Sequence, residues 1–316
     1  MRQKLQPVKE RQITSHLLMV RPAHFGYNPE TATNNAFQSL NPDLTSGQVE
    51  QQALQEFDTF VARLRDAGVQ VHVVEDTTMP IKPDAIFPNN WVTFHQDGTV
   101  ATYPMHAPTR RKERREDVIE QLSAQFEVRD RVKFEGTEAE GRFLEGTGSL
   151  ILDRPNRIAY ACLSPRTETA LLETFCNKMG YKKVAFTAVD GDGKAIYHTN
   201  VMMALGVDFV VICLDAVPDK AEQQFLKDQF AATGKAIIEI SLDQMMAFAG
   251  NMLQVAGKDG TPYLVMSEQA YQSLNPAQVE LIGQYTQILH SPLYTIEQHG
   301  GGSARCMMAE IFLEEK

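Results

Sequence analysis

Apolar residues recur at helical spacing in residues 48–68, where Val49, Phe57 and Leu64 fall on one face. Gly68 ends this pattern, as is typical of a helix C-terminus, and an alternating strand pattern follows in residues 69–76. The same succession recurs four more times, so the sequence predicts five helix–strand units. The further pairs are 111–125 with 126–134, 167–180 with 181–190, 219–234 with 235–243, and 275–286 with 287–298.

Segments that read as β-hairpins lie between these units. Each has two short apolar or alternating runs around a turn, and the four are 91–105, 149–164, 200–215 and 252–266. A fifth hairpin is predicted from segments at the two ends of the chain, 304–312 pairing with 15–22. Because this pairing closes a ring, we expect one α/β domain over 1–316, a five-bladed propeller of ββαβ units with pseudo-fivefold symmetry.

Polar residues occupy the corresponding position in each unit, next to the first hairpin strand. They are Asn90, Glu145, His198, Asn251 and Cys306, spaced 55, 53, 53 and 55 residues apart. Equivalent positions of a ring converge on its axis. We therefore expect Glu145, His198 and Cys306 to meet at one end of the ring, although they are far apart in sequence.

Composition and charge limit the classes of function. Of the 316 residues, 43% are hydrophobic and 22% charged, as in a globular protein, and the formal net charge is −10. That charge argues against nucleic acid or an anionic membrane as a partner. The N-terminal stretch has no apolar core of the kind a secretory signal needs, and the longest apolar run, 201–214, is too short to span a membrane. A cytoplasmic location is expected.

The four cysteines contain no C-x-x-C pair, and Cys162, Cys176 and Cys213 lie in apolar patterns that favour burial in the core. Cys306 differs because Gly300, Gly301 and Gly302 precede it. One interpretation is a tight turn before a core thiol. The other is a flexible approach to a nucleophile, for which a nearby histidine favours the thiolate and carries protons while a carboxylate orients the ring.

A metal site is the main competing use of these residue types, because Cys, His and Glu can together bind zinc. No second histidine or cysteine lies at ligand spacing, so we expect no metal and no cofactor. A phosphate-binding loop is disfavoured as well, because the glycines lack the lysine and the strand–helix frame of such loops.

Several motifs together resemble those of the pentein superfamily, whose enzymes modify guanidino groups. They are "GGGSARCM", "RFLEGTGS", "YHTNVMM", "DAIFPNN" and "APTRRKE". The resemblance covers essentially the whole chain and implies the five-bladed propeller. It also implies Cys306 as nucleophile, His198 as general acid and base, and Glu145 as the orienting carboxylate. Arg110 and Arg166 match residues that hold the substrate carboxylate, and Asp84 matches a further substrate contact.

The departures from that family pattern bear on the substrate. Arginine-directed members carry carboxylates at the positions of Asn89 and Asn90, and deiminases often carry aspartate at that of Asn200. Carboxylates grip a planar cation, whereas amides offer donors and an acceptor to a neutral ureido group. The sequence therefore best resembles the citrulline-hydrolysing branch, although succinylarginine dihydrolases, which are longer chains, also use neutral residues here while accepting a guanidinium.

The leading hypothesis is thus a cysteine hydrolase that converts citrulline to ornithine, ammonia and carbon dioxide through a thiocarbamoyl enzyme. One alternative is a deiminase or dimethylaminohydrolase that acts on arginine or its methylated forms. Another is a non-catalytic ring that binds an amino acid or a protein. The expected partner is a small amino acid, with a homo-oligomer left open.

Overall fold

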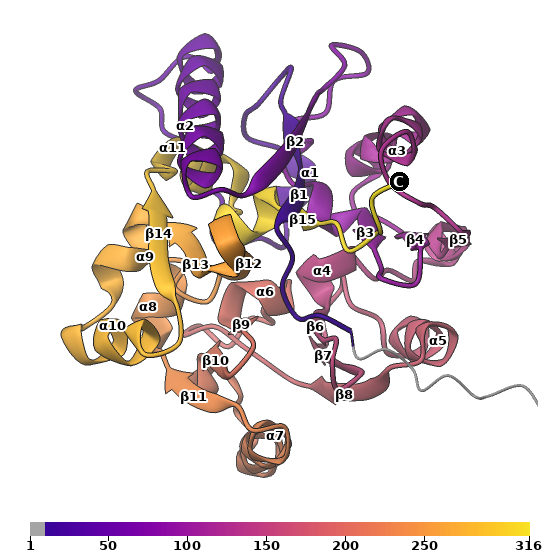
Figure 1. Ribbon diagram of the computed structural model, residues 1–316. Helices are drawn as coiled ribbons and strands as arrows, with labels where there is room; N and C mark the ends of the chain where they lie inside the picture. Colours follow the sequence, from indigo (N-terminus) through magenta and orange to yellow (C-terminus); the bar gives the residue numbers. More distant parts are fainter. Residues whose placement is uncertain (1–9) are drawn as a thin grey trace, which may run out of the picture.

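The computed structural model describes residues 10–316, so the first nine residues of the predicted domain lie outside the described part. Five three-stranded sheets are arranged around a common centre, and Figure 1 shows the larger helices outside them. This confirms the predicted α/β propeller. That the whole of 1–316 is one domain stays a prediction.

Each sheet has the same topology. Its middle strand pairs antiparallel with the first strand and parallel with the third. The first strands are β15 (Ala309–Glu310), β3 (Val92–Phe94), β6 (Ile151–Asp153), β9 (Met203–Leu205) and β12 (Leu253–Ala256). The middle strands are β1 (His16–Arg21), β4 (Thr99–Thr102), β7 (Ile158–Cys162), β10 (Phe209–Ile212) and β13 (Pro262–Ser267). The third strands are β2 (Gln70–Glu75), β5 (Asp130–Lys133), β8 (Lys182–Phe186), β11 (Ala236–Glu239) and β14 (Gln287–Ser291).

Helices make the crossover between the second and third strand of each sheet, because parallel neighbours cannot be joined by a tight turn. The crossover helices are α2 (Ser46–Asp66), α3 (Glu116–Ser123), α5 (Thr169–Met179), α7 (Lys220–Ala232) and the pair α9 (Glu268–Ser273) and α10 (Pro276–Gly283). In α2 the buried residues are those of the predicted face, including Val49, Phe57 and Leu64. A capping box at Thr45 starts this helix.

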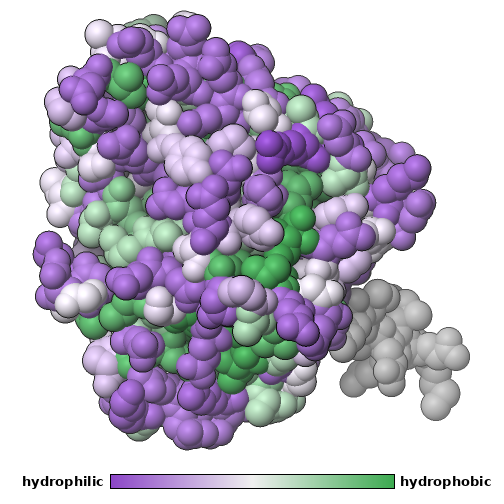
Figure 2. Space-filling model, turned by 90° about the vertical axis from the view of Figure 1, so that its left-hand side faces the viewer, coloured by the Kyte–Doolittle hydropathy of each residue, from purple (hydrophilic) through white to green (hydrophobic). Residues whose placement is uncertain are grey.

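The ring is closed by segments from the two ends of the chain, as predicted. Leu17 and Leu18 of β1 pair antiparallel with Glu310 and Ala309 of β15. The core consists of buried clusters within and between the blades rather than one central cluster. Figure 2 views the molecule from the side of α9 and α10, where the surface is mostly hydrophilic with hydrophobic residues between. No helix within 10–316 has the length and apolar character needed to cross a membrane.

Two expected strands differ from the structure. Residues 287–298 were expected to be extended, but the strand ends at Ser291, before Pro292, which has no N–H for the ladder, and α11 (Tyr294–Gly300) follows. The expected strand at the start of 200–215 begins instead as one helical turn, α6 (Thr199–Met202). A similar turn, α4 (Gly146–Ser149), follows Glu145.

The remaining short elements lie in the connections between strands. The helical turns are α1 (Pro29–Ala32) and α8 (Leu242–Met246). The 3-10 turns are η1 (Pro88–Asn90), η2 (Pro108–Glu113), η3 (Glu135–Glu140), η4 (Leu214–Ala216), η5 (Lys258–Gly260) and η6 (Ala304–Met307).

Candidate active site

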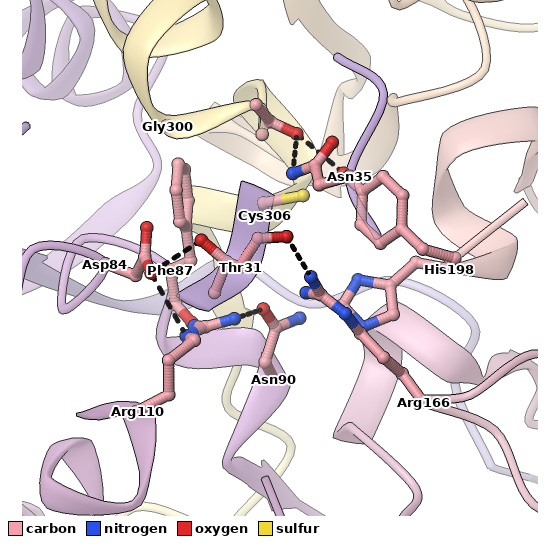
Figure 3. A pocket seen from close by; sticks show the side chains of 13 residues that line it. Thr31, Asn35, Asp84, Phe87, Asn90, Arg110, Arg166, His198, Gly300 and Cys306 are labelled. Atoms are coloured by element: carbon pink, nitrogen blue, oxygen red, sulfur yellow. Dashed lines mark hydrogen bonds and ion pairs between the residues drawn. The ribbon is translucent and has the colours of Figure 1, made fainter. Parts of the chain in front are cut away.

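The repeated polar positions converge at the centre of the ring, where short helical turns carry them. Asn90 ends η1, Glu145 and His198 immediately precede α4 and α6, and Cys306 lies in η6. Figure 3 shows the side chains around a cavity that Cys306, His198 and Asn90 line together. The ring therefore assembles a site from segments more than 200 residues apart.

The thiol of Cys306 lies between two amide groups and is 3% exposed. Asn200 Nδ2 is 3.4 Å from Cys306 Sγ, and Asn251 Nδ2 is 3.3 Å from it. Asn251 is oriented by two further contacts, because its Nδ2 donates to the Asn200 carbonyl at 2.8 Å and its Oδ1 accepts from the Arg305 N–H at 3.0 Å. Both contacts with Cys306 Sγ thus place amide N–H groups against the sulfur.

His198 and Glu145 form the second part of the site. His198 Nε2 lies 2.7 Å from Glu145 Oε2, so the carboxylate holds the ring with the proton on Nε2 and leaves Nδ1 as the basic nitrogen. Burial lowers the pKa of His198 to about 4, although the hydrogen bond to Glu145 works in the opposite direction. The imidazole is therefore neutral at neutral pH and can accept a proton.

Glu145 itself is fully buried and ionised. Burial alone would raise the pKa of this carboxyl, but the Arg166 guanidinium and the hydrogen bond from His198 outweigh it and hold the pKa far below its usual range. Arg166 Nη1 is 3.6 Å from Glu145 Oε2, and the other oxygen, Oε1, accepts from the His106 N–H at 2.8 Å. Both carboxylate oxygens are thus engaged by the protein.

Arg110 lines the cavity as part of a buried charge pair. Its Nε and Nη2 each donate to the Glu113 carboxylate at 2.9 Å, and its Nη1 donates to Asn90 Oδ1 at 2.7 Å. Burial raises the pKa of Glu113 to about 7, against the influence of Arg110. The guanidinium thereby fixes Asn90 with its oxygen toward Arg110 and its NH₂ group on the other side.

The two neighbouring asparagines have different surroundings. Asn90 lines the cavity, whereas the side chain of Asn89 does not. Asn89 Oδ1 accepts from Asn90 Nδ2 at 3.0 Å, and Asn89 Nδ2 lies 3.4 Å from Thr147 Oγ1. The sequence groups both with Asn200 as substrate contacts, but of these three asparagines only Asn90 lines the cavity, while Asn200 contacts the Cys306 sulfur.

Asp84 lies on the cavity wall opposite His198 and Arg166 (Figure 3). Its Oδ2 accepts from Asn28 Nδ2 at 2.7 Å and is 3.9 Å from Arg110 Nε. Its Oδ1 is buried and has no hydrogen-bond partner among the described residues. Burial raises the pKa of Asp84, partly offset by Arg110, so a cationic group placed against Oδ1 would stabilise the ionised form.

Residues of the N-terminal segment complete the cavity, and no sequence motif predicted them. Thr31 and Asn35 line it together with Tyr197. Arg166 holds this segment in place, because its Nη2 donates to the Thr31 carbonyl at 3.0 Å and its Nε and Nη2 both contact Asn34 Oδ1. The free volume beside the thiol is about 20 Å³.

The three glycines form the C-terminal end of α11 and the wall of the cavity, where close packing explains their use. Gly301 has φ +61°, and its N–H donates to the Glu297 carbonyl at 2.9 Å, a left-handed helix cap. A Cβ at Gly300 or Gly302 would lie 2.9 Å from the Phe87 ring. Of the two interpretations of this run, the tight turn is the geometry observed, and it leads to a thiol that lines the cavity.

Within residues 10–316, no three His, Cys, Asp or Glu side chains are grouped so that they could hold a metal ion. The arrangement suits nucleophilic chemistry instead: a thiol between amide donors, a neutral imidazole held by a carboxylate, and an unpaired carboxylate oxygen on the opposite wall.

A protein-family model described as N,N dimethylarginine dimethylhydrolase, eukaryotic, matches residues 21–313. No curated protein sequence matches the chain.

Solved structures share the fold at low identity. Apo ArgZ, an arginine dihydrolase from the ornithine–ammonia cycle in Cyanobacteria, has a TM-score of 0.73 at 16% identity over 94% of this chain, which spans only 40% of the ArgZ chain. The substrate-bound N-terminal domain of ArgZ has a TM-score of 0.72 at 16% identity, over 94% of this chain and 99% of that domain. A dimethylarginine dimethylaminohydrolase adduct with S-methyl-L-thiocitrulline has a TM-score of 0.63 at 14% identity, over 95% of this chain and 100% of that chain.

Proposed function

The chain belongs to the family described as eukaryotic N,N dimethylarginine dimethylhydrolase, within the pentein superfamily of hydrolases. We propose that it hydrolyses the ureido group of citrulline through Cys306. The observation that carries the proposal is the composition of the surface around the thiol. Asn200 and Asn251 contact the sulfur, and Asn90 lines the same cavity. A neutral reacting group suits these neutral partners.

The surroundings of the Glu145 carboxylate, near the reacting end, support the same substrate. Both oxygens of Glu145 already accept hydrogen bonds, from His106 and His198, and Arg166 balances the charge. A guanidinium at the thiol would therefore meet no unpartnered oxygen of Glu145. The ureido carbonyl can instead accept from amide N–H groups, while the buried Oδ1 atom of Asn200 can accept from its NH₂ group.

The opposite end of the cavity suits an amino-acid head group. The unpaired Oδ1 atom of Asp84 would accept hydrogen bonds from an α-ammonium group. Arg110, beside Asp84, and Arg166, on the opposite wall, would both attract the α-carboxylate. The head group is thereby held away from Cys306, so that the end of the side chain is presented to the sulfur.

In the reaction we propose, His198 Nδ1 takes the thiol proton and the Cys306 thiolate attacks the ureido carbon. The imidazolium then protonates the departing nitrogen as its bond to that carbon breaks, which leaves a thiocarbamoyl enzyme. His198 next takes a proton from a water molecule, which attacks the same carbon, so that the C–S bond breaks and the thiolate is released and reprotonated by His198. The resulting carbamic acid breaks down to carbon dioxide and the second amine. In sum, citrulline and one water give ornithine, ammonia and carbon dioxide.

Arginine is the second candidate substrate, because the solved relatives include arginine dihydrolases bound to substrate and product. Product analysis separates the two. We expect ornithine and ammonia from citrulline, with little turnover of arginine or dimethylarginine. Citrulline accumulating from arginine would favour a guanidino hydrolase, and saturable binding without turnover would favour a non-catalytic ring.

The variant that tests the nucleophile is Cys306→Ala, for which we expect no turnover of citrulline. Cys176→Ala is the matched control, because Cys176 is buried in α5 and does not line the cavity. Alkylation of the wild-type thiol should abolish activity, and a chelator should not. Residual activity of Cys306→Ala would exclude the covalent mechanism.

A further inference from the structure

A second cavity lies among the inner strands of the ring and shares no lining residue with the catalytic cavity. Its free volume is about 20 Å³. Residues of β6, β9 and β12 form much of its wall, and its charged members are Arg154, Arg305 and Glu310. These three side chains are 2%, 4% and 9% exposed, so all are nine-tenths buried or more.

Arg154 has far fewer hydrogen bonds than a buried guanidinium needs. Of its five N–H groups, one makes a long contact of 3.5 Å to His95 Nδ1, and none of the others donates a hydrogen bond to a residue within 10–316. Glu310 Oε2 is 4.0 Å from Arg154 Nη2, beyond hydrogen-bond distance, and the Phe312 ring lies 4.0 Å below the guanidinium. Burial, reinforced by Arg154, lowers the pKa of His95 to about 3, so this neighbour is neutral and supplies no counter-charge.

The one carboxylate in the cavity is already engaged. Glu310 Oε2 accepts from Arg305 Nη2 at 2.8 Å, and Arg305 Nη1 donates to the Met308 carbonyl at 2.8 Å. Asp153, the residue before Arg154, contacts Lys235 at 3.9 Å and accepts from Asn156 at 2.9 Å instead. Two guanidinium groups therefore share one carboxylate, which leaves one positive charge in excess in a buried space.

Taking an unpaired charge out of water is costly unless it is paired and hydrogen-bonded. We propose that this cavity is a binding site for a small inorganic monoanion, of which chloride is the physiological example, held by Arg154 and Arg305. The volume accommodates an ion little larger than one water molecule and excludes an amino acid or a phosphate ester. The excess of one positive charge sets the charge of the ligand.

The site is joined to the catalytic centre through the backbone of η6. The Arg305 N–H donates to Asn251 Oδ1, and Asn251 Nδ2 lies 3.3 Å from Cys306 Sγ. An anion that fixes the Arg305 side chain would thus also stabilise the turn that carries the nucleophile. Binding itself requires nothing of the proposed reaction, so the two proposals can fail separately.

The test compares chloride with gluconate, an anion too large for the cavity, at constant ionic strength. The thermal unfolding midpoint of the full chain is followed as one salt replaces the other. We expect the midpoint to rise with chloride alone, as binding to the native state requires. In crystals soaked in bromide, an anomalous peak should appear between Arg154 and Arg305.

Three variants define the site. Arg154→Gln should abolish the chloride-dependent rise, and Glu310→Gln should lower the half-saturating chloride concentration about tenfold, because it removes a competing carboxylate worth about 1.4 kcal/mol. Arg129→Gln, at a surface arginine 53% exposed, should behave as wild type. Equal midpoints in chloride and gluconate would overturn the proposal, as would an undiminished rise in Arg154→Gln. Should Arg154→Gln fail to fold, Glu310→Gln and the bromide peak decide the question.

Discussion

At the scale of single residues, the Cys306 thiol contacts neighbours that come from other blades. Asn200 and Asn251 direct amide N–H groups at Cys306 Sγ, and Asn251 is itself held by the backbone of Asn200 and of Arg305. Hydrogen bonds to a charged group contribute more to stability than those between neutral groups. These two amides should therefore matter most when the sulfur carries its negative charge.

Replacing Asn251 with alanine removes one of the two donors. We expect Asn251→Ala to slow alkylation of Cys306 by iodoacetamide at neutral pH about tenfold, because a hydrogen bond to a charged group contributes about 1.5–3 kcal/mol. The measurement is the alkylation rate followed by mass spectrometry of the peptide that contains Cys306. Asn177→Ala, an exposed position on α5, is the control. An unchanged rate would mean that Asn251 supports only the fold.

The pH dependence of activity follows from His198. Burial lowers the pKa of this histidine to about 4, so its neutral, proton-accepting form predominates at all higher pH values. We expect kcat/KM for citrulline to keep its acid-side plateau well below pH 6 and to fall only as the pH approaches 4. Glu145→Gln removes an influence that raises this pKa, so the acid limb should move lower still while kcat falls. An acid limb at the ordinary histidine value near 6.5 would contradict this account.

At the scale of elements, the spacing of apolar residues along the chain predicted most of the helices and strands. Helix α2, the five hairpins and the ring closure follow from patterns that burial enforces along whole segments. The spacing of 53–55 residues between equivalent positions predicted that Asn251 lies near the axis. No motif around Asn251 indicated its contact with the Cys306 sulfur. Thr31 and Asn35 were missed because their segment has no periodicity, and tertiary contacts alone position it. The sequence predicted Arg110 as a substrate contact but did not predict its ion pair with Glu113. The i, i+3 spacing allows such a pair, but only the burial of both side chains fixes it, and burial is not visible in the sequence.

We expect the N-terminal segment 28–38 to move when substrate enters the proposed catalytic cavity. A free volume of about 20 Å³ holds only one or two water molecules, far less than an amino acid. Side chains at each end hold the segment, since Asn28 contacts Asp84 and Gln38 Nε2 donates to the His299 carbonyl at 2.8 Å. Arg166 and Thr109 hold its middle through side-chain contacts as well, rather than through a strand ladder. We therefore expect the segment to open more readily than the sheets do.

Hydrogen–deuterium exchange tests this motion. In Cys306→Ala, which cannot turn over, saturating citrulline should slow exchange in peptides covering 28–38 about tenfold, because the segment closes on the ligand. Peptides from α5 (Thr169–Met179), on the outside of another blade, should be unaffected. Gln38→Ala removes the contact with His299 and should speed exchange in the free protein. Identical exchange with and without ligand would place substrate entry elsewhere.

At the scale of the whole molecule, the C-terminal segment both closes the ring and carries Cys306, the proposed nucleophile. β15 begins three residues after Cys306, and the Ile311 N–H beyond it donates to the His16 carbonyl at 2.9 Å. Ile311 and Leu313 are buried in the cluster of the blade formed by β3, β4 and β5. This C-terminal seam, residues 309–313, therefore joins two blades. Its unfolding should involve the whole ring rather than one end of the chain.

Leu313→Ala tests this cooperativity, because the side chain is 3% exposed and belongs to the seam. We expect the free energy of unfolding to fall by about 2–5 kcal/mol, the range for a leucine truncated in a core. Denaturant unfolding followed by fluorescence and by residual activity should still give one coincident transition. Leu40→Ala, at a side chain 61% exposed, should change stability by no more than about 0.5 kcal/mol. Separate transitions in Leu313→Ala, with activity lost first, would mean that the C-terminal seam unfolds independently of the other blades.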